Sequence, residues 1–313
     1  MGASSLSSRA IIGEFYNTLQ QNLGATWIPL ISNYFDSNQE METYKWLGMV
    51  PAMREWIGGR QAKGLRENGL DIRNKSFEAT LEVLVDEIRR DKTGQVMIRV
   101  RELAARANSH WAKLLSAFIA NGESAVCYDG QYFYDTDHVE GDSGAQSNRI
   151  TADVAVPAKP TAGEMEGAIL AAVQQLLAIK DDQGEPLNED ASQFLVMVPI
   201  NLMAPAAGAL GSQIVMEGGA ARSNLILTAG SLGGLDFKLA TNARLPWTTK
   251  FAVFNTGSEA KALIRQEEEG IKVEAIAEGS ELEFKEKKHW YGVSAQRNVG
   301  YGYWQRSVLT ELT

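Results

Sequence analysis

Near its end this 313-residue chain reads HWYGV over residues 289–293 and RNVGYGYWQ over residues 297–305. Glycines alternate there with large aromatic residues, and a period of two predicts a β-strand. Such a strand places Gly300, Gly302 and Trp304 on one face. Two glycines on one face normally weaken a strand, so they indicate that another backbone or a flat ring approaches closely there.

The residues before this stretch predict further strands. FAVF at 251–254 ends at an Asn-Thr-Gly turn, KVEA at 272–275 precedes a Glu-Gly turn, and ELEFK at 281–285 alternates strictly. Between the first two strands, Glu267, Glu268 and Glu269 form an acidic run, which we interpret as a solvated turn. This part of the chain should therefore return as long strands.

Residues 190–250 have a different pattern, with short apolar runs and one small helix. FLVMV at 194–198 is typical of a fully buried strand, and LIL at 225–227 and FKL at 237–239 predict two more. Residues 202–210 predict the small helix. We expect a compact lobe of mixed α/β structure.

Three longer helices are predicted in the first half of the chain. Ser8 can cap the first helix, and Gly24 is placed to end it. Apolar residues at helical spacing from Val96 to Phe118 predict a second helix of about seven turns. Thr161 and Glu164 form the capping-box signature of a third helix. After the first helix, residues 27–39 show no sustained period, so we expect an arm that lies on something else.

Residues 41–80 are locally basic and interrupted by glycines. The segment contains Arg54, Arg60, Lys63 and Arg66, although the whole chain carries a formal charge of −9. One interpretation of this basic segment is a patch that binds nucleic acid, and another is a solvated loop without a partner. We favour a long projecting hairpin that lies on an acidic neighbour, with its base anchored by aromatic residues: Trp46, Trp56 and Phe77.

Four stretches, in this order and spacing, resemble the major head subunits of Mu-like bacteriophages and prophages. They are YKWLGMVP at 44–51 running into REWIG at 54–58, NKSFE at 74–78, CYDGQYFYDTDH at 127–138 and the glycine-aromatic ending. The resemblance implies an α+β fold of the Hong Kong 97 (HK97) capsid type. Its expected parts are an N-terminal arm (1–40), an extended β-hairpin loop (41–80), a peripheral domain with a long spine helix and long strands (81–189 and 251–313) and a mixed α/β axial domain (190–250).

The resemblance also implies a function, that of the major capsid protein of a tailed double-stranded DNA phage or prophage. Such subunits self-assemble into pentamers and hexamers of an icosahedral shell that encloses the genome. The implied partners are other copies of the chain, a scaffold or protease, a portal and a decoration protein. The expected location is the virion, with assembly in the bacterial cytoplasm.

Subunit contacts are then expected from the basic loop and the acidic run. The residues that we predict to make them are Arg54, Trp56, Arg60, Lys63, Arg66, Glu267, Glu268 and Glu269. In this reading the glutamates pair with the basic loop of a neighbouring subunit, a contact that would be sensitive to salt.

Composition agrees with a cytoplasmic, non-enzymatic protein. A net charge of −9 and a pI near 5.1 argue against tight binding to a phosphate backbone, so DNA would be enclosed without sequence-specific contacts. No apolar run reaches the roughly 20 residues of a membrane span, and no signal peptide is evident. No phosphate-binding, dinucleotide, zinc-protease or nucleophile-elbow motif is present, so we expect no enzyme and no cofactor.

Two alternatives remain open at this point. A cargo shell of the encapsulin kind would share the fold and would be distinguished by an inner groove for a cargo peptide. A hydrolase would have to use a carboxylate pair such as Asp135 and Asp137. The acidic residues with His138 do not match a calcium loop or a zinc site, and the single cysteine, Cys127, has no neighbouring histidine in sequence, so we predict neither a metal nor a nucleophile.

Overall fold

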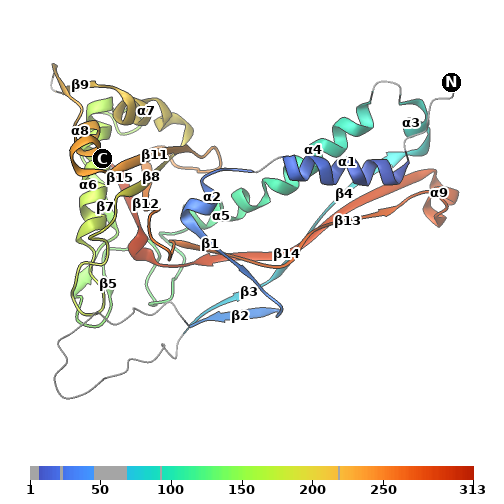
Figure 1. Cartoon of the computed structure of the whole chain (residues 1–313), viewed down its shortest axis with the longest axis horizontal. Coiled ribbons are helices and arrows are strands. Elements are labelled where there is room, and N and C mark those ends of the chain that lie inside the picture. The colour runs from blue at the N-terminus through green and yellow to red at the C-terminus, as the bar shows by residue number, and fades with distance from the viewer. Residues whose placement is uncertain (1–6, 22–23, 46–68, 92–93, 218) are drawn as a thin grey trace, which may run out of the picture.

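A computed structural model describes residues 7–21, 24–45, 69–91, 94–217 and 219–313. The molecule is elongated, with a broad lobe at one end and a long arm at the other (Figure 1). The first described helical residues, 8–21, lie on the arm, and the C-terminus lies in the broad lobe (Figure 1). No helix in the described part of the chain has the length and apolar character needed to span a bilayer.

The arm is built on a four-stranded sheet in the order β1-β13-β14-β4. Its strands are β1 (Ser32–Asp36), β13 (Leu263–Ile276), β14 (Lys288–Tyr301) and β4 (Lys75–Leu84). β1 runs parallel to β13, and the other pairs are antiparallel. Two helices, α1 (Ser8–Gln21) and α4 (Gln95–Asn108), pack together and bury an apolar cluster with this sheet.

The broad lobe contains a five-stranded sheet in the order β11-β8-β12-β15-β7. These strands are β11 (Asp236–Thr241), β8 (Gln193–Val198), β12 (Lys250–Asn255), β15 (Ser307–Leu312) and β7 (Arg149–Ala152). α6 (Ala162–Ala178) packs against β15 and β12. Three of the five strands thus come from residues outside or at the edge of 190–250, including segments that the sequence analysis assigned to the peripheral domain.

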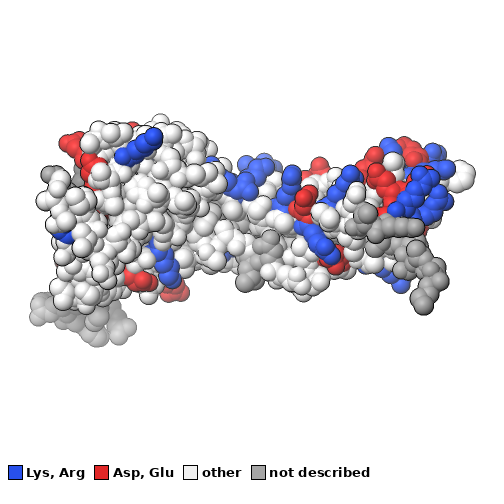
Figure 2. Space-filling view, turned by 90° about the horizontal axis from the view of Figure 1, so that it is seen from above, with Lys and Arg blue, Asp and Glu red and all other residues white. Residues whose placement is uncertain are grey.

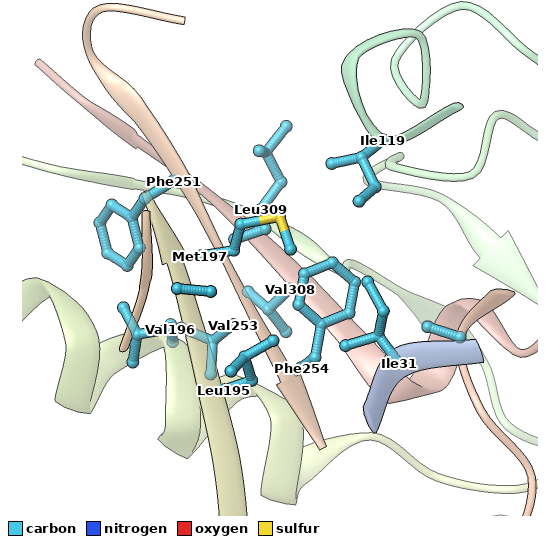
Figure 3. Packing of buried hydrophobic residues seen from close by; sticks show 14 of the residues in the cluster. Ile31, Ile119, Leu195, Val196, Met197, Phe251, Val253, Phe254, Val308 and Leu309 are labelled. Carbon is cyan, nitrogen blue, oxygen red and sulfur yellow. The ribbon is translucent and has the colours of Figure 1, made fainter. Parts of the chain in front are cut away.

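The core of the lobe continues to the junction with the arm. Figure 3 shows Ile31 of α2 (Ile28–Ile31) and Ile119 of α5 (His110–Ala120) beside Phe254, Val308 and neighbouring apolar side chains of the lobe sheet. These residues all belong to one buried cluster. The segment after the first helix, which has no sustained period in sequence, therefore lies on the core of its own subunit.

Smaller elements complete the fold. They are β2 (Met41–Tyr44) with β3 (Leu70–Arg73), β5 (His138–Val139) with β6 (Ala145–Gln146), β9 (Ile214–Glu217) with β10 (Ala220–Ser223), α3 (Val85–Arg90), α7 (Met203–Gly211), α8 (Leu225–Gly233), α9 (Glu281–Glu286) and two 3₁₀ turns, η1 (Ile200–Leu202) and η2 (Trp304–Arg306). The β2–β3 pair is antiparallel and lies within residues 41–80, where a hairpin was predicted; residues 46–68 of that segment lie outside the described residues.

The glycine-aromatic ending forms the passage from arm to lobe. A β-carbon at Gly300 would lie 2.3 Å from Cδ1 of Ile72, and one at Gly302 would lie 2.5 Å from the backbone oxygen of Lys261. The expected close approach is thus confirmed, by a backbone at Gly302 and by an aliphatic side chain at Gly300. The predicted strand was too long, because β14 ends at Tyr301 and Trp304 belongs to η2.

Three sequence predictions of local structure were wrong. Residues 225–227 begin α8 because the side chain of Asn224 caps the helix by accepting from the N–H of Leu227 at 3.1 Å. Residues 281–285 form α9 because Ser280 accepts from the N–H of Glu283, which outweighs their alternation. The acidic run at 267–269 is no turn, since it lies inside β13 at a register shift against β14.

Other predictions were confirmed, with one modification. The capping box of Thr161 and Glu164 is present at the start of α6, and β8, β11, β12 and α7 occupy the predicted segments. The spine helix is divided at Ser109 into α4 and α5. The hydroxyl of Ser109 donates to the carbonyl of Arg106 at 3.0 Å, a local bond that competes with the helical ladder.

Candidate assembly surfaces

The β2–β3 pair is fixed to the arm sheet. Tyr44 of β2 donates to the side chain of Gln266 at 2.7 Å, and Gln266 donates in turn to the carbonyl of Ile72 in β3 at 3.1 Å. Burial and the charge of Glu42 raise the pKa of Tyr44 to about 12, so its hydroxyl stays a donor at neutral pH. The β2–β3 pair thus has a defined position on the sheet.

The basic residues predicted to make contacts lie outside the described residues. They are Arg54, Trp56, Arg60, Lys63 and Arg66, and Trp46 lies there too. Phe77 is described and lies in β4, where its ring contacts that of His110 at a centroid distance of 4.4 Å.

The acidic run is largely engaged within its own subunit. Glu267 accepts from the hydroxyl of Tyr34 at 2.6 Å and lies 3.4 Å from Nε of Arg297. Glu269 pairs with Lys272 at 2.8 Å. Burial and then Glu267 raise the pKa of Tyr34. Among the described residues, Glu268 alone of the three forms no ion pair.

Arg297 is buried at the centre of this group, with 1% of its surface exposed. Its guanidinium lies over the ring of Trp111 at 4.7 Å from the centroid, and burial lowers its pKa, although Glu267 opposes this shift. A buried cation next to a carboxylate and an indole face has a structural role here: it joins β14 to α5 and β13.

The tip of the broad lobe exposes an unusual number of large apolar side chains. Those on η1, α7, α8 and β9 are Ile200, Met203, Ile214, Met216, Leu225, Leu227 and Leu232, and Leu232 is 84% exposed. α7, α8 and β9 lie together at one end of the lobe in Figure 1, and η1 contacts α7. The face of the lobe seen in Figure 2 carries few charges. We call these seven residues the lobe-tip patch. A contiguous apolar patch on a soluble protein is typical of an interaction surface.

The opposite end of the molecule has a second group of exposed apolar residues. Phe284 of α9 is 89% exposed, and Leu84, Ile276 and Trp290 from the ends of three arm strands are also exposed. This arm-tip patch lies at the far end of the β13–β14 hairpin (Figure 1). The molecule therefore presents apolar surface at both ends of its long axis.

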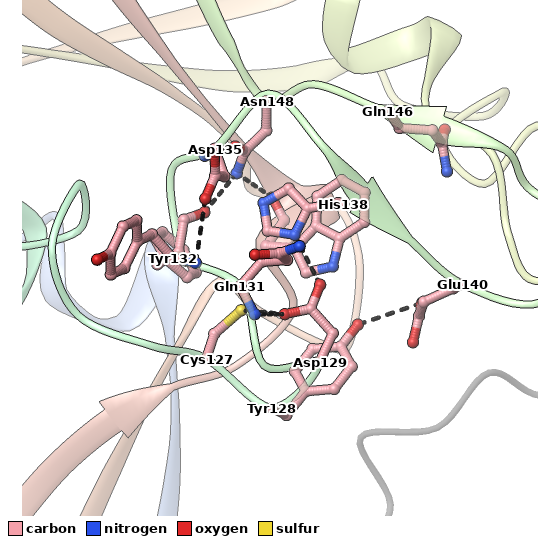
Figure 4. A network of polar contacts seen from close by, with 12 residues as sticks. Cys127, Tyr128, Asp129, Gln131, Tyr132, Asp135, His138, Glu140, Gln146 and Asn148 are labelled. Atoms are coloured by element: carbon pink, nitrogen blue, oxygen red, sulfur yellow. Dashed lines mark hydrogen bonds and ion pairs between the residues drawn. The ribbon is translucent and has the colours of Figure 1, made fainter.

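The segment at 127–148 holds a polar network that sequence reasoning missed. The carboxylate of Asp129 accepts from Sγ of Cys127 at 2.9 Å and lies 2.6 Å from Nδ1 of His138 (Figure 4). The ring of His138 stacks on that of Trp304 with centroids 3.9 Å apart. The thiol and the imidazole are far enough apart in sequence that no spacing rule for metal ligands or nucleophiles would select them.

Two of the short distances in this group are those of hydrogen bonds, from Cys127 to Asp129 and from His138 to Asp129. Burial, and then the charge of Asp129, raise the pKa of Cys127, which keeps it a thiol at neutral pH. Burial alone would raise the pKa of Asp129, but hydrogen bonds from His138 and Cys127 hold it below its usual range. The three ligand atoms of Cys127, Asp129 and His138 all lie within 4.8 Å of one another.

Asp135, one member of the candidate carboxylate pair Asp135 and Asp137, is bonded to the backbone of its own loop. Asp135 accepts from the backbone N–H groups of Tyr132 and Thr136, at 3.3 and 2.8 Å, and its own N–H donates to the side chain of Asn148. Asp137 is exposed, two residues further on. A carboxylate that closes a turn in this way is used to hold the loop in place.

Comparisons with known proteins point in one direction. The chain is 33% identical over 128 residues to the Mu-like prophage FluMu major head subunit of Haemophilus influenzae, covering 39% of this chain and 42% of that protein. It is 32% identical over 108 residues to the major capsid protein of Escherichia phage Mu, covering 34% of this chain and 35% of that protein. The matches thus span less than half the length of these curated relatives.

Structural similarity extends over the whole chain. The procapsid of bacteriophage JBD30 matches with a TM-score of 0.56 and 22% identity, covering 98% of this chain and 76% of that one. The fold is therefore of the HK97 capsid type, as expected from the resemblance. The family model of the Mu-like prophage major head subunit gpT matches residues 8–160 and 238–312, more than half of the chain. This chain belongs to the family of Mu-like prophage major head subunits.

Proposed function

We propose that this chain is the shell-forming subunit of the head of a Mu-like tailed phage or prophage, assembling into pentamers and hexamers around double-stranded DNA. The observation that carries the proposal is the pair of apolar patches at opposite ends of an HK97-type fold. Leu232 at the lobe tip and Phe284 at the arm tip are 84% and 89% exposed. Surfaces of this kind are costly to leave in water and are buried by association.

Association, without a chemical step, is the mechanism. The buried titratable groups, including Cys127 and Asp129, are occupied by hydrogen bonds inside the subunit. The lobe tip would meet other lobe tips around the centre of a capsomer, and the arm tip would meet neighbours at its edge. A scaffold or protease, a portal and a decoration protein are further partners that we propose for the assembled head.

The basic hairpin is proposed to contribute a further contact. Arg54, Trp56, Arg60, Lys63 and Arg66 would lie on the acidic run of a neighbouring subunit. Since Glu267 and Glu269 are already paired within their own subunit, Glu268 is the carboxylate left for that contact. Reversing Arg60 and Lys63 to glutamate should then reduce shell yield while leaving a folded subunit.

A cargo shell of the encapsulin kind is the second candidate, because it would share the fold. Family membership over residues 8–160 and 238–312 favours the phage head. The two differ in what they enclose, which is genome in one case and a peptide-tagged protein in the other.

Electron microscopy tests the proposal. Recombinant protein should be separated by size-exclusion chromatography and imaged in negative stain, alone and with a candidate scaffold encoded beside it. Closed shells or rings of five and six subunits are the expected result. Monodisperse single subunits in both samples, at concentrations where related shells form, would contradict the proposal.

A further inference from the structure

A groove of about 660 Å³ lies between the spine helix and the arm sheet. One wall is the outer strand β4 at residues 77–80, and the other is formed by the end of α4 and the start of α5. Its floor includes apolar side chains: Leu103, Ala107, Ile271 and Val293. The groove therefore lies where the spine helix is divided at Ser109.

Three exposed cations gather at this groove. They are Arg106, Lys113 and Arg244. Among the described residues, Arg106 and Lys113 form no ion pair, and the guanidinium of Arg244 bonds only the hydroxyl of Ser109, at 3.4 Å. Within the described lining of the groove, Glu78 is the one acidic residue. Figure 2 shows a group of Lys and Arg side chains where the broad lobe meets the arm.

The three exposed cations of the groove have no ion-pair partner in the part of the subunit that the structure describes. His110 also lines the groove, and its pKa is lowered to about 4, first by burial and then by Arg297, Lys113 and Arg244. A histidine next to balanced charges would not feel this repulsion. The groove is therefore electrostatically suited to a group of carboxylates.

An acidic loop elsewhere on the same chain has the complementary character. Glu185, Glu189 and Asp190 follow α6, are exposed, and have no ion-pair partner among the described residues. The loop is held in shape, because Asp181 accepts from the N–H groups of residues 183 and 185 at 2.9 Å each. Buried Asn188 anchors it by donating to the carbonyl of Leu176 at 2.8 Å. A preorganised loop loses little conformational entropy on binding.

We propose that the acidic loop at 185–190 of one subunit docks into the basic groove of a second copy. Within one subunit the described residues form no ion pair between the two surfaces, so their pairing requires another chain. The contact joins two different surfaces, and such a heterologous interface produces closed rings when its rotation closes. This inference rests on the proposed function, which it extends by naming the two surfaces.

Nucleic acid is a poorer occupant of the same groove. The chain carries a net charge of −9, which repels a long polyanion more than it repels a short acidic loop. The apolar floor at Leu103 and Val293 also suits a peptide, whose aliphatic side chains can cover it. A phosphate backbone would leave that floor exposed to water.

Charge exchange tests the pairing. One variant carries Arg106→Glu, Lys113→Glu and Arg244→Glu, a second carries Glu185→Lys, Glu189→Lys and Asp190→Lys, and a third carries all six substitutions. A matched control reverses three exposed cations elsewhere, Arg90, Lys159 and Lys238, to glutamate. Shell yield is measured by chromatography and electron microscopy, and folding of each subunit by circular dichroism and urea unfolding.

The expected result is a drop in shell yield of at least about tenfold for each triple variant, because like charges then face each other across the interface. The variant with all six substitutions should regain shells, and the control should assemble like the native chain. A native shell yield from the groove variant would overturn the proposal. If the shells of that variant formed normally but lacked DNA, the groove would be assigned to nucleic acid instead. Failure of the native chain itself to assemble would instead count against the proposed function.

Discussion

Adding one methyl group at Gly302 should destabilise the subunit severely. A β-carbon there would lie 2.5 Å from the backbone oxygen of Lys261 and 3.2 Å from the carbonyl carbon of Ala262. These backbone atoms are held in place, because the N–H of Gly302 donates to Ala262 at 2.8 Å and the N–H of Tyr303 donates to Lys261 at 3.2 Å. Overpacking of buried sites costs about 1–3 kcal/mol, and a clash with backbone should lie at the upper end of this range.

The measurement is equilibrium urea unfolding of the unassembled subunit. Gly302→Ala should lower the free energy of unfolding by about 3 kcal/mol. Gly167 provides a matched control, since it is an exposed residue inside α6 where an added β-carbon would have no neighbouring heavy atom within 4 Å. Alanine at Gly167 should raise stability by about 0.5–1 kcal/mol, because it removes the entropic penalty of glycine in a helix.

Gly300 allows the reason for the clash to be checked. There the atoms nearest to an added β-carbon belong to the side chain of Ile72, Cδ1 at 2.3 Å and Cγ1 at 2.9 Å. Ile72→Val removes Cδ1, so it should recover part of the loss caused by Gly300→Ala, although alone it costs about 0.5–1.5 kcal/mol. No side-chain truncation should rescue Gly302→Ala. Unfolding of Gly302→Ala at the native urea midpoint would refute the reasoning.

Three further predictions concern pH, capping and assembly. The pKa of His110 is about 4 in the folded subunit, below its ordinary value of 6.5, so the unfolded chain binds the proton more tightly. The free energy of unfolding should therefore fall as the pH drops from 6.5 to 4. His110→Gln should flatten that part of the curve in urea unfolding at stepped pH. Thr161→Ala removes the cap that accepts from the N–H of Glu164 and should cost about 1 kcal/mol in the same assay. Leu225→Glu with Leu232→Glu should leave urea unfolding unchanged and abolish shells by electron microscopy, and normal shells would exclude the lobe-tip patch as an interface.

Sequence reasoning located the elements whose signals are local. The cap of α6 at Thr161, the buried strand β8 and the close approach at Gly302 each depend on a few neighbouring residues. It failed where two local signals compete. Residues 281–285 alternate like a strand, but Ser280 and Glu283 form a helix cap, and the cap determined the structure.

The surfaces could not be predicted in the same way, because they are assembled from distant segments. The groove combines Arg106 and Lys113 with Arg244, which follows β11 in the other sheet. The sequence also shows no histidine near Cys127, because only the folded loop brings His138 to Asp129, the residue that Cys127 bonds. The acidic run at 267–269 was predicted to be solvated, because the sequence does not show that Nε of Arg297 lies 3.4 Å from the carboxylate of Glu267.

The junction between lobe and arm shows why polar residues are buried in this subunit. Asn188 donates to the carbonyls of Leu176 and Gln305, at 2.8 and 2.9 Å, and accepts from Asn255 at 3.0 Å, so one side chain joins α6, β12 and the passage from β14 to β15. A buried amide with paired donors and acceptor tolerates little change in geometry, since an unpaired group there costs about 1–3 kcal/mol. The network therefore fixes the passage from β14 to β15 on the lobe. A subunit that associates through patches at both ends of its long axis needs this rigidity, because a small rotation at the junction becomes a large displacement at the arm tip.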